Sequence, residues 1–359
     1  MMAKKAGRIL IAAGVAVAVV IAAVGLSLAQ RDEQSRVVIK PGTHVPEVRA
    51  MLSDLRVEKP RRHKNMVVFP LRWAGRQAGG DWETMDDSIA SGRLKISEKD
   101  NASVPEVVIE NTGGKSVLLM SGEIVKGGKQ TRVIKADTVI ETRQTVTVPV
   151  FCVERRRWHG GKKFSLSPNI APSSIRNEMS RGADQGAVWG SVRKAQEAAG
   201  AEAPTESLDE VLDSDKVKQM YEEVHKSMGK FSPKDTIGIA VADTRTGRVI
   251  ALELFGRRDL FEALQDKLIE GYAMDLVGVS ERAEKIAPKD VTAKDVEAFI
   301  RRALDGTSRY EDTPGSGRGI DLTAGSIKGK GVALGDCLIH ISIQDQRPDV
   351  TPARPVVRE

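Results

Sequence analysis

Hydrophobic and polar residues alternate along much of the middle of the chain, as they do in β-strands that bury one face. Valine and isoleucine dominate these segments, and glycine-containing or polar turns separate them. The pattern predicts strands over residues 66–69, 106–109, 116–125, 130–134 and 145–154. Short turns join two later strand pairs and predict hairpins, namely 237–241 with 249–252 and 331–334 with 338–341.

The apolar period changes to that of a helix in other parts of the second half. Residues 184–199 and 214–228 each carry one apolar stripe, and Asp259 and Thr292 are predicted to cap two further helices. Strands joined by short turns pair antiparallel, and the strand and helix blocks are segregated. We therefore expect an α+β fold, mainly antiparallel sheet with helices packed on one side, in one large domain over residues 66–345.

The N-terminus has a different pattern. Residues 9–29 are without charge, and Lys4, Lys5 and Arg8 precede them. Such a run predicts an apolar helix that is either a signal peptide or a membrane anchor. Small residues at positions 27–29 favour cleavage, whereas the length of the run suffices for an anchor. Either outcome predicts an extracytoplasmic protein, membrane-anchored or secreted/periplasmic.

The segments that flank the large domain have weaker patterns. Residues 30–65 are predicted to be a linker with one short strand at 37–39. Residues 346–359 are rich in proline and predict a disordered tail.

Composition and motifs exclude only a few classes of function. The chain has 55 basic and 49 acidic residues and a net charge of +6, so a general preference for polyanions is not expected. We find no nucleic-acid module, no phosphate or dinucleotide fingerprint and no metal-ligand spacing, and therefore predict no nucleic-acid partner, no cofactor and no metal site. The two cysteines, Cys152 and Cys337, could form one disulfide in an oxidising compartment.

A first polar cluster surrounds residues 127–128, two glycines between strand-like segments. A two-residue hairpin there would place Lys126 opposite Lys129 and Glu123 opposite Arg132. Lys129 and Arg132 are suited to binding a phosphate or a carboxylate. The alternative is a structural ion pair between Glu123 and Arg132.

A second cluster ends the strand at 148–159, which reads VPVFCVERRRWH. Alternation places Cys152 and Glu154 side by side at the end of an apolar stripe. Arginines nearby would lower the pKa of the Cys152 thiol, and His159 is the local candidate base, so Cys152 is a candidate nucleophile. The alternative is a buried, inert cysteine.

The other members of this cluster also have two interpretations. Glu154 is a candidate general acid or base, or the ion-pair partner of Arg157 or Arg132. Trp158 could stack on a ring ligand or serve packing alone. Further along the chain, His340 alternates with two isoleucines and is interpreted as a strand-face residue.

Together, GEIVKGGKQTR at 122–132 and VPVFCVERRRW at 148–158 resemble the ARG and Rhodanese-Phosphatase-superfamily-associated protein domain. DQGAVW at 184–189 is similar to the same family, and the resemblance covers about residues 65–280, with an extension to about 345. Thr131 and Arg156 depart from the family pattern, where asparagine and glycine are common. The positions that match it are Glu123, Lys129, Gln130, Arg132, Cys152, Glu154, Arg157 and Trp158.

The family name refers to genomic association with ADP-ribosylglycohydrolases and rhodanese-like phosphatases. The resemblance therefore implies binding or processing of a phosphate-bearing nucleotide or NAD-derived ligand. The predicted catalytic residues are Glu123, Cys152 and Glu154, and the predicted ligand-binding residues are Lys129, Gln130, Arg132, Arg157 and Trp158. We expect Cys152, Glu154 and Arg157 to meet Glu123, Gln130 and Arg132 of the preceding hairpin in one polar cluster at the edge of the sheet. The alternative is a non-catalytic envelope binding module whose polar cluster is a structural ion-pair network. The predicted partners are a phosphate-bearing small molecule and, if residues 9–29 are uncleaved, the membrane.

Overall fold

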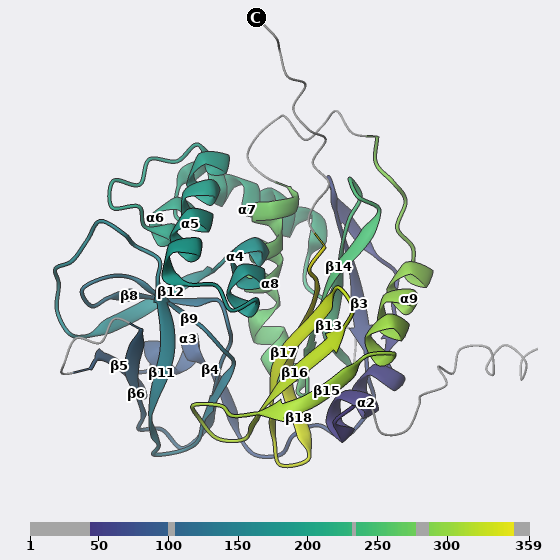
Figure 1. Ribbon diagram of the computed structural model, residues 1–359, viewed down its shortest axis with the longest axis horizontal. Coiled ribbons are helices and arrows are strands. Elements are labelled where there is room, and N and C mark those ends of the chain that lie inside the picture. Colours follow the sequence, from purple (N-terminus) through teal and green to yellow (C-terminus); the bar gives the residue numbers. More distant parts are fainter. Residues whose placement is uncertain (1–43, 100–104, 232–234, 278–286, 348–359) are drawn as a thin grey trace, which may run out of the picture. The chain divides into compact units, whose positions relative to one another are not determined.

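The computed structural model describes residues 44–99, 105–231, 235–277 and 287–347. These residues form three sheets and eight helices, and the strands pair antiparallel except for β4 (Trp82–Thr84) with β7 (Ser116–Leu119) (Figure 1). The α+β class and the mainly antiparallel pairing are thus confirmed. The predicted apolar helix at 9–29, the strand at 37–39 and most of the predicted tail lie outside the described residues. Within those residues, no helix is long and apolar enough to cross a membrane.

The largest sheet has nine strands in the order β1-β3-β13-β14-β18-β17-β16-β15, with β2 also paired to β3. Both predicted hairpins are confirmed in it, β13–β14 and β17–β18, the latter with Leu334 opposite Cys337. The strands are β1 (Arg56–Val57), β2 (Arg61–His63), β3 (Met66–Arg72), β13 (Thr236–Asp243), β14 (Arg248–Phe255), β15 (Thr307–Glu311), β16 (Arg318–Ala324), β17 (Ile327–Leu334) and β18 (Cys337–Asp345).

The two smaller sheets come from the first half of the chain. One has six strands in the order β12-β8-β9-β11-β6-β5, and the other has three in the order β10-β7-β4. Their remaining strands are β5 (Leu94–Glu98), β6 (Glu106–Asn111), β8 (Glu123–Gly127), β9 (Arg132–Ile134), β10 (Thr138–Ile140), β11 (Thr145–Cys152) and β12 (Phe164–Ile170).

Local capping signals place several helices. The Asp184 side chain accepts from the Ala187 N–H at the start of α5, and Thr292 forms a capping box with Asp295 at the start of α9. Asp259 is not the predicted cap, because α8 begins one residue earlier and Asp259 instead pairs with Arg257. The helices are α2 (Pro46–Ser53), α3 (Met85–Ala90), α4 (Ser173–Ser180), α5 (Gln185–Ala199), α6 (Leu208–Leu212), α7 (Asp215–Met228), α8 (Arg258–Leu276) and α9 (Ala293–Leu304).

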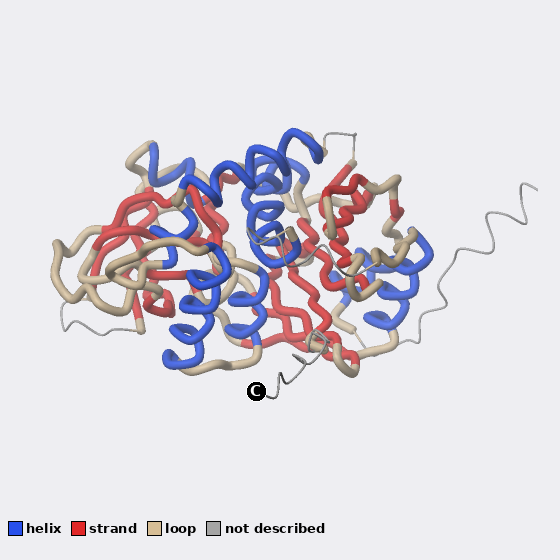
Figure 2. The backbone as a smooth tube through the Cα atoms, turned by 90° about the horizontal axis from the view of Figure 1, so that it is seen from above, coloured by secondary structure: helices blue, strands red, loops and turns tan. Residues whose placement is uncertain are grey.

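Helices cover both faces of the nine-stranded sheet, so the prediction of helices on one side is wrong. Helix α8 packs against β3, β13 and β14 and also against β4 and β12 of the smaller sheets. Helix α9 packs against β1, β14 and β16, and α2 packs against α9 and β18 (Figure 1). Consecutive residues of β3, such as Val67 and Val68, are fully buried, as expected for a strand covered on both sides. Figure 2 shows the helices that lie between the two groups of strands.

The segment predicted as one strand over 116–125 is two strands, β7 and β8. The chain turns at Gly122, whose φ of 99° suits glycine. The hairpin register also differs from the prediction, because Val125 rather than Glu123 lies opposite Arg132. The physical reason is a third strand: Gly127 pairs with Phe164 of β12, so the loop to β9 is longer than two residues.

The described part of the predicted linker, residues 44–65, is instead folded into the structure as α2, β1 and β2. In α2, Val48 and Met51 are buried, and the Glu47 carboxylate accepts from the Tyr310 hydroxyl at 2.7 Å. Arg318 lies 3.1 Å from the same carboxylate. Helix α2 therefore belongs to the core on the α9 side of the sheet.

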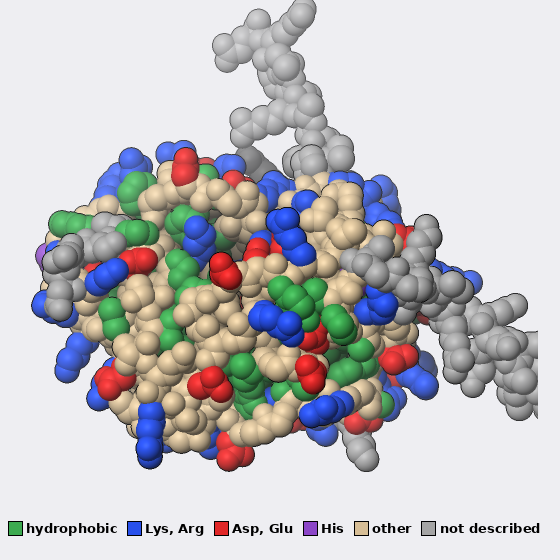
Figure 3. All heavy atoms as spheres, turned by 60° about the horizontal axis from the view of Figure 1, so that its bottom comes forward, with side chains coloured by type: hydrophobic (Ala, Val, Ile, Leu, Met, Phe, Trp, Pro, Cys, Tyr) green, Lys and Arg blue, Asp and Glu red, His purple; other side chains and the backbone are tan. Residues whose placement is uncertain are grey.

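Basic and acidic side chains are interspersed over the face of the molecule drawn in Figure 3. This distribution fits the near balance of 55 basic and 49 acidic residues in the chain.

Candidate functional site

Strands β9 and β11 bring the two sequence motifs together, because Cys152 lies directly opposite Arg132. The Arg132 guanidinium lies 2.7 Å from the Cys152 sulfur and 3.1 Å from Gln130 Oε1. Its second terminal nitrogen lies 3.6 Å from Glu98. Only 1% of the Arg132 surface is exposed. The predicted meeting of Arg132, Gln130 and Cys152 is thus found in the structure, in the interior.

Glu154 is bonded on both carboxylate oxygens. Oε2 accepts from the Thr131 N–H and hydroxyl, each at 2.9 Å, and from Arg157 Nη2 at 2.6 Å. Arg157 Nε reaches Oε1 at 2.7 Å. Burial alone would raise the pKa of Glu154, but the hydrogen bonds from Arg157 and Thr131 outweigh it and hold the pKa below its usual value. The ion-pair interpretation with Arg157 therefore describes this structure.

Cys152 is a buried thiol held by its neighbours. Burial raises its pKa to about 11, and this effect exceeds the opposing effect of the Arg132 charge. Gln185 of α5 holds the Cys152 backbone, accepting from its N–H at 2.9 Å and donating to its carbonyl at 2.8 Å. His159, the predicted base, lies on an exposed loop. Cys152 and Cys337 are both free, so the disulfide is absent from this structure.

Glu123 is not part of this cluster. Its fully buried carboxylate accepts from the Met120 N–H at 2.8 Å and lies 3.1 Å from Lys267 Nζ of α8. Lys267 also lies 2.7 Å from Asp86. Burial raises the pKa of Glu123 despite the Lys267 charge. The two-residue shift in the hairpin register therefore separates Glu123 from Arg132 and gives it a different partner.

The structure contains a second buried network that the sequence motifs did not indicate. At its centre, the Glu253 carboxylate of β14 accepts from the Tyr272 hydroxyl at 2.5 Å and from Ser342 at 3.1 Å. Arg176 of α4 lies 2.5 Å away, and His340 Nε2 lies 3.2 Å away. Burial opposes ionisation, but Arg176 and His340 lower the pKa of Glu253 to about 2.

His340 lies between two carboxylates. Its Nδ1 lies 2.6 Å from Asp137 and its Nε2 faces Glu253. Burial would lower the His340 pKa, but Asp137 and Glu253 raise it to about 9, so the imidazole is protonated at neutral pH. Asp137 in turn accepts from the Ser121 N–H at 2.8 Å. The interpretation of His340 as an ordinary strand-face residue missed this role.

The pairing register of the large sheet explains how these groups come together. A polar row crosses five neighbouring strands, with one residue each from β14, β18, β17, β16 and β15. The row consists of Glu253, Ser342, Lys330, Asp321 and Arg309, each directly opposite the next. A charged residue inside an apolar run, as in 252–254 or 339–341, was the available sequence signal for it.

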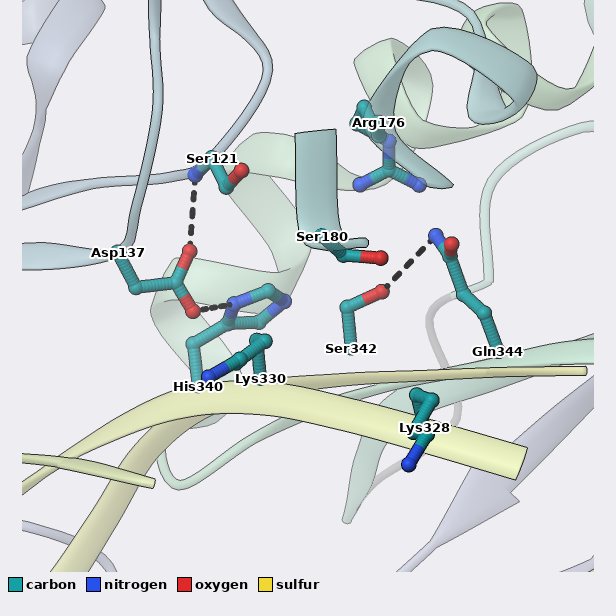
Figure 4. A pocket seen from close by; sticks show the side chains of 9 residues that line it. All are labelled: Ser121, Asp137, Arg176, Ser180, Lys328, Lys330, His340, Ser342 and Gln344. Carbon is teal, nitrogen blue, oxygen red and sulfur yellow. Dashed lines mark hydrogen bonds and ion pairs between the residues drawn. The ribbon is translucent and has the colours of Figure 1, made fainter. Parts of the chain in front are cut away.

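This polar face borders a cavity of about 30 Å³, which is room for one or two water molecules. Figure 4 shows Arg176 and Ser180 of α4 opposite Ser342 and Gln344 of β18. Two buried atoms in the cavity wall, Arg176 Nε and Gln344 Oε1, have no hydrogen-bond partner among the described residues. The cavity therefore offers one unpaired donor and one unpaired acceptor.

A much larger groove of about 550 Å³ shares Gln344 with the cavity. Its walls come from α4, α5, the end of α8, the β13–β14 hairpin and the end of β18. Tyr272 lines the groove and reaches Glu253 of the buried network. The charged side chains that line it are Glu178, Arg181, Lys194, Arg245, Arg248, Asp275, Asp345 and Arg347.

Fold and site together define an α+β protein with two buried polar networks, one of which borders a groove of ligand size. The family model of the ARG and Rhodanese-Phosphatase-superfamily-associated Protein domain matches residues 54–344, and the chain belongs to this family. The resemblance based on the two sequence motifs is thereby confirmed. Neither the curated proteins nor the solved structures contain a match. The family match reaches β18 and so includes both polar networks.

Proposed function

We propose that this protein is a binding domain for a phosphate-bearing small molecule, which lies in the groove and places one polar group in the adjoining cavity. The observation that carries the proposal is the pair of unpaired buried atoms, Arg176 Nε and Gln344 Oε1, in the cavity wall. Unpaired buried polar atoms are costly, so they favour a bound group that satisfies both. A hydroxyl, or a water bound to a ligand oxygen, supplies the required acceptor and donor.

Size and charge support a phosphate-bearing ligand. A groove of about 550 Å³ lies in the range of small-molecule sites. Basic residues outnumber acidic ones among its charged lining side chains. Asp345 is already paired with Arg347, and Asp275 accepts from Ser173 and Ser174. Arg245 is likewise paired, with Asp243. Phosphate oxygens suit the positive charge of the lining, to which Lys194 of α5 contributes.

The motif cluster around Arg132 serves, in this proposal, as a scaffold. A ligand that used Arg132 would have to displace its contacts with Cys152 and Gln130 in the protein interior. The alternative function, a non-catalytic envelope module with no small ligand, is favoured by these internal contacts, although Arg132 Nε has no hydrogen-bond partner among the described residues. The catalytic roles of Glu123, Cys152 and Glu154 stay predictions.

We also propose that the protein acts outside the cytoplasm. The support is the uncharged run 9–29, which follows Lys4, Lys5 and Arg8. A reporter that is active only after export, fused after residue 359 of the full chain, should be active. Deletion of residues 9–29 should abolish that activity, and retained activity would contradict export through this run.

Thermal unfolding of the full chain tests ligand binding directly. The panel should contain inorganic phosphate, nucleotides, ADP-ribose, NAD and sugar phosphates. A ligand at about 100 times its dissociation constant should stabilise the fold by about 2.7 kcal/mol and raise the midpoint by a few degrees. Because Lys194 lines the groove and Gln344 borders both spaces, Lys194→Gln and Gln344→Leu should each reduce the shift.

Lys226→Gln, an exposed change on α7, is the matched control and should keep the full shift. Unchanged shifts in both groove variants would refute the assignment of the groove. No shift across the whole panel would favour the envelope-module alternative, and the search would turn to a protein partner.

A further inference from the structure

The loop that follows β11 carries a second exposed feature, independent of the groove. Arg157 ties this loop to the β8–β9 loop, because its guanidinium donates to the carbonyls of Gly127, Gly128 and His159 at 2.8 to 3.1 Å. The same guanidinium binds Glu154. With all these donors used internally, Arg157 is a positioning residue, and the segment around it is held in place.

Arg157 presents an exposed tryptophan. Trp158 is 53% exposed. Among the described residues, no other large hydrophobic side chain is exposed. Lys129 of the β8–β9 loop lies 5.5 Å from the centre of its ring, as in a cation–π contact. An indole combines an apolar ring with a polar N–H, so a ring at an exposed loop tip suits a surface that is apolar on one side and hydrated on the other.

The residues around Trp158 are strongly basic. The loop over residues 155–163 reads RRRWHGGKK and contains no acidic residue, and its members are exposed except for the half-buried Arg157. Glu206 lies 2.7 Å from Arg156 and 3.8 Å from Arg155. One carboxylate shared between two arginines leaves the loop with an excess of positive charge. Exposed pairs of this kind are weak and exchange partners readily.

We propose that this loop docks on an anionic lipid surface, with the Trp158 indole at the level of the headgroups and with Lys129, Arg155, Arg156 and Lys163 facing lipid phosphates. Tryptophan prefers the membrane–water interface, where its ring is partly dehydrated and its N–H stays hydrated. Lys and Arg beside it are attracted to anionic headgroups. Each basic residue near such a surface strengthens binding by about fivefold.

The observations favour a lipid surface over the other polyanions. Single-stranded nucleic acid is normally held by several aromatic rings that stack successive bases, whereas this loop offers one. A free phosphate ligand requires an enclosing site, whereas the residues of this loop project into solvent. A flat lipid surface requires only what the loop presents, a single interfacial ring surrounded by positive charge.

Quenching of Trp158 by lipids brominated on their acyl chains tests the proposal on the full chain. Insertion of residues 9–29 would hold the chain on both kinds of vesicle alike, so the difference in quenching between the two lipid compositions reports the loop. We expect strong quenching in vesicles of equal parts phosphatidylcholine and phosphatidylglycerol, and little in phosphatidylcholine alone. High salt should weaken it, because it screens the charges. Trp158→Phe gives the baseline from the other three tryptophans.

A charge variant with a matched control completes the test. Arg155→Gln with Arg156→Gln should lower the apparent affinity for the anionic vesicles by about 25-fold, two steps of fivefold. Lys226→Gln with Lys230→Gln removes two exposed charges elsewhere and should change it little. Equal quenching in both vesicle types, no quenching in either, or a stronger response of Trp158 to an oligothymidylate would each overturn the proposal. Binding of small phosphate ligands in the groove is unaffected by any of these outcomes.

Discussion

Cys152 shows, among single residues, how burial and long-range neighbours decide the chemistry of a side chain. The local sequence places three arginines after it, which would lower the thiol pKa. In the structure Arg155 and Arg156 face solvent, and the cation beside the sulfur is Arg132 of the neighbouring strand. Burial nevertheless dominates and raises the pKa to about 11. A raised pKa favours the second of the two interpretations of the sequence, a buried and inert cysteine.

Thiol labelling at pH 8 should therefore distinguish the two cysteines. With a pKa of about 11, about one Cys152 thiol in a thousand is ionised at that pH. We expect one rapid reaction per native chain, at the half-buried Cys337, and a second only after unfolding. In Cys337→Ser the rapid phase should vanish. A rapid phase that survives in this variant would show that Cys152 is reactive.

Residue types and short spacings were enough to predict part of the candidate site. Arg132, Gln130 and Cys152 meet as expected, because adjacent strands of one sheet carry them. The contacts of Glu253 and His340 could not be predicted from the sequence, since Asp137 and His340 are 203 positions apart. No local pattern specifies such a contact, which depends on how separate sheets pack.

For whole elements, local signals succeeded where one turn or one cap decides the structure. The hairpin at 335–336 and the capping box of α9 are of this kind. The β8–β9 register failed because β12, a strand formed by residues 164–170, pairs with the end of β8. A register that depends on a third strand cannot be derived from the two strands that share it.

The network that joins α4, α8, β14 and β18 predicts a pH dependence of stability. Because the His340 pKa is raised from 6.5 to about 9, its stabilising contribution is complete below pH 6.5 and is lost as the pH rises through 9. The Glu253 pKa is lowered from 4.5 to about 2, so its contribution is complete above pH 4.5 and is lost as the pH falls toward 2. Both contributions are complete between pH 4.5 and 6.5.

Urea unfolding at a series of pH values can isolate the histidine. His340→Gln should lower the free energy of unfolding by a few kcal/mol below pH 6.5, because it removes the cation from buried Asp137 and leaves Glu253 with Arg176 alone. The difference from the wild type should shrink as the pH rises from 6.5 to 9. His159→Gln, on the exposed loop, is the control. A difference independent of pH would contradict a protonated His340.

At the level of the whole molecule, the core begins before the family match does. Residues 46–53 form α2 against α9 and β18, whereas the family match starts at residue 54. Met51 of this helix is 1% exposed. Met51→Ala should cost about 2–5 kcal/mol of unfolding free energy in chemical denaturation. Lys59→Ala, an exposed change nearby, should stay within about 0.5 kcal/mol. If Met51→Ala and Lys59→Ala changed the unfolding free energy equally, α2 would not contribute to the stability of the core.

The position of β18 has a consequence for folding during synthesis of the chain. It is the last strand of the described residues, yet it lies in the interior of the large sheet, between β14 and β17. Until residues 337–345 have been synthesised, β14 and β17 each present an open edge, and His340 and Ser342 cannot reach Glu253. Open edges of this kind invite pairing with other chains. A nascent or prematurely terminated chain that lacks residues 337–345 is therefore exposed to aggregation, and it would depend on chaperones until β18 has been made.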